Sequence, residues 1–216
     1  MSTPLRARSL AWPVLAACVL AACTSGPAPV DDRPYDEQVL AWRRQKDADF
    51  RASDNSSSPI PAAQRAAFRG LSYFLIDATY HVPAYLTRES TTPPVVIELQ
   101  TSGPEVHRKV QKVGVLGFTL HGSPYRIMAF AEEGSLDRLF VPFADLTSGR
   151  ETYGGGRYLD LDRTATGLYD LDFNRAYHPY CVYNSTYDCP VPPRENRLPV
   201  AIQAGERLAD SPRASK

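Results

Sequence analysis

The stretch KVQKVGVLGFTLHGSPYRIMAFAEEGSLDRLFVPF, residues 109–143, decides the fold. Its apolar, branched and aromatic residues form short runs separated by turn signals at 121–124 and 132–135, a pattern typical of consecutive antiparallel strands. We predict strands over 109–120, 125–131 and 139–143. Gly114 and Gly117 fall inside the first of these, and glycines within a strand indicate a bulge or a barrel corner.

Similar runs recur on both sides of this stretch at a spacing of about ten residues. They predict further strands over 71–76, 80–86, 95–99, 157–161, 168–173 and 199–203. Upstream, residues 35–52 have the spacing of an amphipathic helix, and a short second helix is predicted over 61–69. The fold class is therefore mainly β: a single antiparallel β-barrel or β-sandwich-like domain over residues 35–210, with one or two N-terminal helices and a disordered tail at 211–216.

The composition excludes several classes of function. The 216 residues are 43% hydrophobic and 22% charged, with 24 basic and 24 acidic residues, so the chain is globular and has no net formal charge. A near-neutral domain lacks the positive surface that binding to nucleic acid requires. The sequence also has no P-loop, dinucleotide fingerprint or calcium loop, and we expect no cofactor.

The first 22 residues resemble a bacterial export signal. Arg6 and Arg8 precede an apolar stretch over 10–22, which is too short to span a bilayer as a helix. The sequence Leu20-Ala21-Ala22-Cys23 resembles a lipobox, whose cysteine is acylated and becomes the first mature residue. Leu15-Ala16-Ala17-Cys18 has the same letters, but it would leave only a short apolar stretch before the cysteine, so we favour Cys23.

Residues 23–34 are rich in Pro, Gly, Ser and Asp and are predicted to be a flexible tether. The expected partner of this end of the chain is a lipid bilayer, held through the acylated Cys23. Because Thr24, and not an aspartate, follows the cysteine, the lipoprotein resemblance implies the outer membrane of the cell envelope, facing the periplasm.

The densest series of motifs lies in residues 140–206, which we call the C-terminal block. In order it reads Phe140-Val141-Pro142-Phe143-x-Asp145-x-Thr147-x-Gly149, Thr152-Tyr153-Gly154-Gly155-Gly156-Arg157-Tyr158-Leu159, Leu171-Asp172-Phe173-Asn174-Arg175-Ala176-Tyr177-x-Pro179-Tyr180-Cys181, Cys189-Pro190-x-Pro192-Pro193-x-Glu195-Asn196-Arg197-Leu198 and Ile202-x-Ala204-Gly205-Glu206. Together with Lys46-Asp47-x-x-Phe50, Ser58-Pro59 and Phe68-x-Gly70-Leu71-x-Tyr73-Phe74, the series resembles domain of unknown function 1684, over about residues 42–206. His178 departs from the small or amide residue common in that family. The family has no established activity. The resemblance therefore indicates where the shared motifs lie in this chain, and it does not indicate a reaction.

Several residues of the C-terminal block are candidates for binding a ligand. The glycine turn 153–157 could form an anion-binding nest of backbone N–H groups, with Arg157 supplying a bidentate charge. The same glycines also fit a tight hairpin turn. The full set of candidate ligand-binding residues is Tyr153, Arg157, Asn174, Tyr177, Asn196 and Arg197.

Four carboxylates of this block are candidate general acids or bases, namely Asp145, Asp172, Glu195 and Glu206. Asp145 could instead cap its own turn, and the charges could simply pair with one another and with Arg157.

Cys181 and Cys189 are the only cysteines expected in the folded domain, and in an oxidising compartment they predict a disulfide bond. Two alternatives use His178. It could join both cysteines and Glu195 at a metal, although the spacing matches no standard zinc pattern and we expect no metal. It could also act as the base for a nucleophilic Cys181.

Two functions remain open from the sequence. The first is a lipid-anchored periplasmic lipoprotein that binds a small or anionic ligand, or an envelope partner, through the C-terminal block. The second is a hydrolase-type enzyme that uses Asp145, Asp172, Glu195, Glu206 or Cys181 in the same block.

Overall fold

A computed structural model of the chain describes residues 31–52, 58–89, 95–103, 107–132 and 135–209. The chain divides into two compact units, Met1–Asp32 and Arg33–Lys216. The predicted signal segment, Cys18, Cys23 and the predicted tail at 211–216 lie outside the described residues. Within the described part of the chain, no helix is both long enough and apolar enough to cross a membrane.

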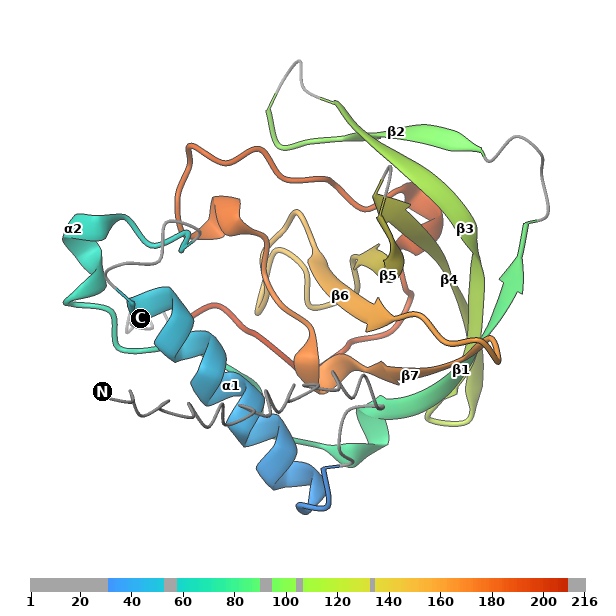
Figure 1. The fold of residues 1–216 in the computed structure, drawn as a ribbon, viewed down its shortest axis with the longest axis horizontal. Helices are drawn as coiled ribbons and strands as arrows, with labels where there is room; N and C mark the ends of the chain where they lie inside the picture. The colour runs from blue at the N-terminus through green and yellow to red at the C-terminus, as the bar shows by residue number, and fades with distance from the viewer. Residues whose placement is uncertain (1–30, 53–57, 90–94, 104–106, 133–134, 210–216) are drawn as a thin grey trace, which may run out of the picture. The chain divides into compact units, whose positions relative to one another are not determined.

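The second unit is mainly β, as predicted, with two α-helices and four short 3-10 helices among its described residues (Figure 1). In chain order its elements are α1 (Tyr35–Arg51), α2 (Ala62–Arg65), η1 (Ala78–Tyr80), β1 (His81–Arg88), β2 (Val96–Gln100), β3 (His107–Leu120), β4 (Ser123–Glu132), β5 (Ser135–Phe143), β6 (Arg157–Asp162), β7 (Leu168–Asp172), η2 (Phe173–Arg175), η3 (Tyr180–Val182) and η4 (Arg194–Asn196).

The strands form one antiparallel sheet in the order β6-β5-β4-β3-β1-β7, and β2 pairs with the start of β3 beside this path. The sheet curls so that it nearly closes into a barrel (Figure 1). Of the two architectures that the sequence allowed, the structure has the barrel-like one. Alternate residues point inward, and the core contains Leu116 from β3, Ile127 from β4, Val141 from β5 and Leu159 from β6.

The predicted bulge occurs at Gly114. The register between β3 and β4 shifts between Lys112 and Gly114. A Cβ atom at Gly114 would lie 2.3 Å from the carbonyl oxygen of Thr87 on β1, so only glycine lets the two strands approach this closely.

Helix α1 begins at Tyr35 and ends at Arg51, close to the predicted bounds, and it docks through the buried apolar side chains of Val39 and Phe50 and through polar contacts. Arg43 is buried, and its guanidinium donates to the carbonyls of Phe74 (3.1 Å) and Asn174 (3.3 Å). The carboxylate of Asp47 accepts from the backbone N–H of Leu71 at 2.9 Å. These contacts hold the helix beside the C-terminal segments of the chain (Figure 1).

Two predicted strands do not form. Residues 71–76 make only an isolated bridge between Tyr73 and Glu206, and residues 199–203 are irregular. The reason is visible in the second segment, whose backbone is bonded by side chains: Ile202 accepts from Arg157 at 2.7 Å and donates to Asp145 at 3.3 Å. An apolar run with these partners has no need of a neighbouring strand to satisfy its backbone.

Candidate functional site

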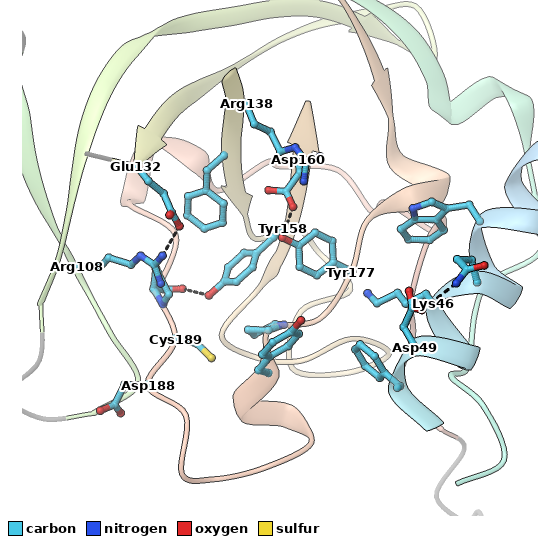
Figure 2. Close-up of a pocket in the computed structure, with 17 residues that line it drawn as sticks. Lys46, Asp49, Arg108, Glu132, Arg138, Tyr158, Asp160, Tyr177, Asp188 and Cys189 are labelled. Atoms are coloured by element: carbon cyan, nitrogen blue, oxygen red, sulfur yellow. Dashed lines mark hydrogen bonds and ion pairs between the residues drawn. The ribbon is translucent and has the colours of Figure 1, made fainter. Parts of the chain in front are cut away.

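A pocket of about 870 Å³ lies between α1, the outer face of β5 and β6, and the segment 177–190 (Figure 2). Alternation along the strands places Phe140, Tyr158 and Asp160 on this outer face, opposite the barrel core. Helix α1 supplies the facing wall. The pocket is lined by Trp42, Gln45, Lys46, Asp49, Phe50, Arg108, Glu132, Arg138, Phe140, Tyr158, Asp160, Tyr177, Pro179, Tyr180, Asp188, Cys189 and Pro190.

Six of the lining residues are aromatic, and three of them form a continuous series along the floor. The rings of Phe140 and Tyr158 meet edge to face at 4.8 Å between centroids, and Tyr158 and Tyr177 do so at 5.7 Å. The hydroxyl of Tyr158 donates to the carbonyl of Pro190, which fixes this ring. The floor is thus a rigid aromatic surface, and packing of this kind favours a preformed site.

Seven lining residues are charged, and each of the three cations is paired with a carboxylate. Arg108 pairs with Glu132 across the pocket from α1 (Figure 2). Arg138 lies 3.4 Å from Asp162, and both of these side chains are largely exposed, so this pair contributes little stability.

Asp160 lies beside Tyr177, whose hydroxyl donates to the carboxylate at 2.8 Å (Figure 2). Although Asp160 is solvent-accessible, the surrounding pocket walls raise its pKa, while the Tyr177 hydrogen bond opposes that effect. Burial and the neighbouring Asp160 charge raise the pKa of Tyr177 well above its ordinary value. Tyr177 therefore stays protonated and holds Asp160 in place as a hydrogen-bond donor.

Lys46 connects the pocket to a buried polar network behind it. Its ammonium lies 2.5 Å from the carboxylate of Glu206 and 4.3 Å from the centre of the Tyr177 ring. Glu206 is fully buried, and it also accepts from the backbone N–H of His178 (2.7 Å) and the hydroxyl of Tyr183 (2.6 Å). A buried carboxylate with this many partners fixes the position of Lys46 in the pocket wall.

His178 is neutral in this network. The backbone N–H of Tyr153 points at its Nε2 from 3.3 Å, so that nitrogen acts as an acceptor. Burial, together with the nearby charges of Arg157 and Lys46, lowers the pKa of His178 to about 3. The carboxylate of Glu206 lies 3.7 Å from Nδ1, but its effect is smaller than the cost of burying an imidazolium.

Arg157 and Asp145, two predicted site residues, form a fully buried ion pair at 2.9 Å. The guanidinium also donates to the carbonyls of Ile202, Ala204 and Glu206. Both terminal nitrogens of Arg157 are thus used within the fold, and the predicted anion would find neither of them available. Asp145 also caps its own turn by accepting from Thr147 at 2.7 Å, as its alternative interpretation stated.

Asp172 and Asn174 form a second structural cluster, on the side of α1. Asp172 accepts from the hydroxyl of Tyr35 at 2.8 Å and from the backbone N–H of Asn174. The Asn174 amide donates to Tyr35 and to the backbone carbonyl of Asp77, both at 2.8 Å. The cluster joins α1 to the end of β7, and neither residue lines the pocket.

Asn196 is buried and bridges two strands, because its amide donates to the carbonyls of Met128 on β4 and Pro142 on β5. Its neighbours Glu195 and Arg197 are exposed. Among the four candidate acids or bases, Asp145, Asp172 and Glu206 are buried with partners, Glu195 is on the surface, and none lines the pocket.

The predicted disulfide bond is absent from the structure, and Cys181 and Cys189 are both free thiols. The Cys189 sulfur accepts from the backbone N–H of Cys181 at 3.1 Å, and the Cys181 thiol lies 3.9 Å from the Tyr153 hydroxyl. Burial raises the pKa of Cys189 to about 12, with the Cys181 thiol adding to the shift, so Cys189 is not a thiolate at neutral pH.

The two alternatives that use His178 gain no support. The His178 nitrogens face Tyr153 and Glu206, so neither is directed at Cys181. The described residues contain no group of three or more His, Cys, Asp or Glu side chains that could hold a metal ion.

Of the predicted site residues, Tyr177 and Cys189 line the pocket, and the wall formed by α1 and by Arg108, Glu132 and Arg138 was missed. Lys46 and Phe50 belong to a motif that the sequence did single out. A usable signal was the polar and aromatic alternation at Tyr158 and Asp160, which places both on the face of β6 opposite the core.

Comparison with known proteins agrees with this architecture. Residues 66–207 match the family described as protein of unknown function, DUF1684. This chain belongs to that family. Its fold is similar to the solution NMR structure of an uncharacterised protein from Haloarcula marismortui, with a TM-score of 0.63 and 38% sequence identity, over 81% of this chain and 94% of the other. No curated protein matches the chain. In this DUF1684 member, α1 lies outside the matched residues and yet supplies five of the residues that line the pocket.

Proposed function

We propose that this DUF1684 protein is a lipid-anchored envelope protein that binds a small polar ligand in the pocket between α1 and the outer face of β5 and β6. The observation that carries the binding function is the pocket itself. Its volume of about 870 Å³ lies within the range of small-molecule sites, and its lining combines six aromatic with seven charged side chains. Nine of its seventeen lining residues belong to the C-terminal block.

A binding role is favoured over hydrolysis by the state of the candidate catalytic groups. Asp145, Asp172 and Glu206 each accept several hydrogen bonds from groups inside the fold. Carboxylates in such a network stabilise the structure and are not available to act on a substrate. The pocket instead presents fixed donors and acceptors around an aromatic floor.

Binding can be tested with a thermal-shift screen of the full-chain Cys23→Ser protein against neutral oligosaccharides, short peptides, polyamines, nucleotides and sugar phosphates. At least one compound is expected to raise Tm, because a ligand that binds only the folded state stabilises it. Tyr177→Phe removes the hydrogen bond to Asp160 and should weaken that compound's effect. Tyr85→Ala, a change on β1 at an exposed ring outside this pocket, should not. A panel without any hit would count against a ligand-binding function.

The envelope location rests on the sequence of residues 1–23, with its charged start, short apolar stretch and lipobox-like Leu20-Ala21-Ala22-Cys23. The acyl chains on Cys23 would give essentially permanent anchoring in the outer membrane, facing the periplasm.

Anchoring can be tested by fractionating cells that express the full chain. We expect the wild type in the membrane pellet with a mass that includes acyl chains on Cys23, and Cys23→Ser in the soluble fraction. Cys18→Ser is the matched control and should remain lipidated. A wild-type chain that retains Met1 and carries no lipid would overturn the anchoring.

A further inference from the structure

The chemistry of the pocket narrows the class of ligand, and this inference rests on the proposed binding function. We propose that the ligand is an uncharged oligosaccharide, which stacks on the aromatic floor and hydrogen-bonds to the paired charged side chains around it.

Charge balance argues against a strongly anionic ligand. The pocket presents three cations and four carboxylates, and its cations already have partners: Lys46 with Glu206, Arg108 with Glu132 and Arg138 with Asp162. A polyanion would have to displace these carboxylates from their cations and would then face the acids left behind.

An organic cation is disfavoured by the position of Lys46. Aromatic rings attract cations over their faces, and here the Lys46 ammonium already occupies that position, 4.3 Å above Tyr177 and 5.4 Å from Phe50. A second cation would be repelled by the first. A purely apolar ligand is disfavoured too, because it would strip water from seven charged side chains without replacing their hydrogen bonds.

An uncharged sugar satisfies each of these features. The C–H groups on one face of a pyranose ring carry partial positive charge and are attracted to the negative faces of aromatic rings such as Phe140 and Tyr158 in the floor. Sugar hydroxyls both donate and accept hydrogen bonds, so they suit side chains that offer fixed groups of both kinds.

Three such pairs border the pocket: Arg108 with Glu132, Tyr177 with Asp160 at 2.8 Å, and Gln45 with Asp49 at 2.8 Å. The Tyr177 hydroxyl holds Asp160 in place before the ligand arrives, which lowers the entropic cost of binding, whereas the other two pairs are exposed and supply polar groups at the rim. The volume of about 870 Å³ falls in the upper part of the range for small-molecule sites, and it therefore favours several linked rings over one.

The test is calorimetric titration of the full-chain Cys23→Ser protein with cellotetraose, maltotetraose and chitotetraose, and with spermidine and inorganic pyrophosphate as charged probes. We expect at least one tetrasaccharide to bind with a Kd below about 1 mM. Because the ligand is uncharged, its Kd should change less than about twofold between low and high salt.

Variants locate the site. Trp42→Ala should weaken tetrasaccharide binding by about tenfold or more, since buried aromatic anchors dominate binding energy. Asp160→Asn, which keeps the shape of the side chain, should also weaken it and serves if Trp42→Ala does not fold. Tyr85→Ala is the matched aromatic control outside the pocket and should bind as the wild type does.

The possible failures are distinguishable. Binding of spermidine or pyrophosphate without any tetrasaccharide would overturn the ligand class and leave the binding function intact. Tetrasaccharide binding that Trp42→Ala and Asp160→Asn leave unchanged would overturn the site. Absence of binding here and in the wider thermal-shift panel would overturn the proposed function itself.

Discussion

Each terminal nitrogen of Arg157 donates two hydrogen bonds, and three of the four acceptors are backbone carbonyls of residues 202–206. The fourth is the carboxylate of Asp145, which supplies the compensating charge. A guanidinium is suited to this role because its donors lie in one rigid plane. The Arg157 side chain thus donates the hydrogen bonds that a neighbouring strand would otherwise donate to the backbone carbonyls of the C-terminal segment. The buried ion pair with Asp145 therefore has a structural role.

Replacing Arg157 by Met should lower the free energy of unfolding by about 3–5 kcal/mol, because the Asp145 carboxylate would remain buried without its partner. Arg157→Lys should also be destabilising, since one ammonium cannot reach all four acceptors. Urea denaturation followed by circular dichroism measures the change. The control is Arg197→Ala at an exposed position, where we expect a change within about 0.5 kcal/mol. An Arg157→Met protein as stable as the wild type would contradict this role.

His178 should make the protein less stable in mild acid. Its folded-state pKa of about 3 lies below the ordinary value of 6.5, so between these values the unfolded chain binds a proton that the folded chain does not. Stability from this group is therefore complete above pH 6.5 and declines as the pH falls towards 3.

Between pH 7 and pH 5 the loss attributable to His178 should be about 2 kcal/mol. Urea denaturation at the two pH values measures it. His178→Asn removes the titrating group, and its stability should depend less on pH over the same interval by about that amount. An equal pH dependence in the two proteins would show that His178 is not the group responsible.

The same residues show how far sequence reasoning reaches at this scale. The glycine turn followed by Arg157 was interpreted as an anion-binding nest or as a tight hairpin turn, and in the structure the guanidinium meets acceptors of the fold itself. The pattern could not tell whether those acceptors belong to a ligand or to residues 202–206, because the pairing joins positions more than forty residues apart. The alternative that Asp145 caps its own turn could be predicted from the sequence, because the cap depends only on residues that are neighbours in the chain.

At the scale of elements, the approach of β1 to β3 at Gly114 sets a strict steric limit. Gly114→Ala should destabilise the protein by about 1–3 kcal/mol, because the new Cβ would lie 2.3 Å from the Thr87 carbonyl and force the strands apart. Gly117→Ala is the matched control on the same strand, where the nearest atom is 4.0 Å away. Thermal unfolding of both variants separates the effects. A Gly114→Ala protein with the Tm of the control would contradict the close approach.

Local patterns predicted α1 and most of the strands well, because their periodicity and turn signals are local properties of the chain. The strands expected at 71–76 and 199–203 failed because apolar runs alone cannot show that side chains of other elements satisfy the backbone. The position of α1 as the pocket wall opposite Tyr158 could not be predicted either, because no local sequence signal shows which elements will face each other.

At the scale of the whole molecule, the C-terminal segment is an integral part of the barrel. A chain that stops after residue 209 retains every described contact and should unfold with the same Tm as the full chain. A chain that stops after residue 200 loses the carbonyl partners of Arg157 and the Glu206 network, and it should fail to give a dispersed NMR spectrum. A folded product from the shorter chain would contradict this dependence.

The dependence of Arg157 on residues 202–206 has a consequence for synthesis. While the ribosome is still adding these residues, the guanidinium has only the Asp145 carboxylate as a partner, and its three hydrogen bonds to backbone carbonyls cannot form. We therefore expect the barrel of the nascent polypeptide to close only after its final stretch has emerged. We expect such a delay to keep the chain in the extended state that the proposed export would require.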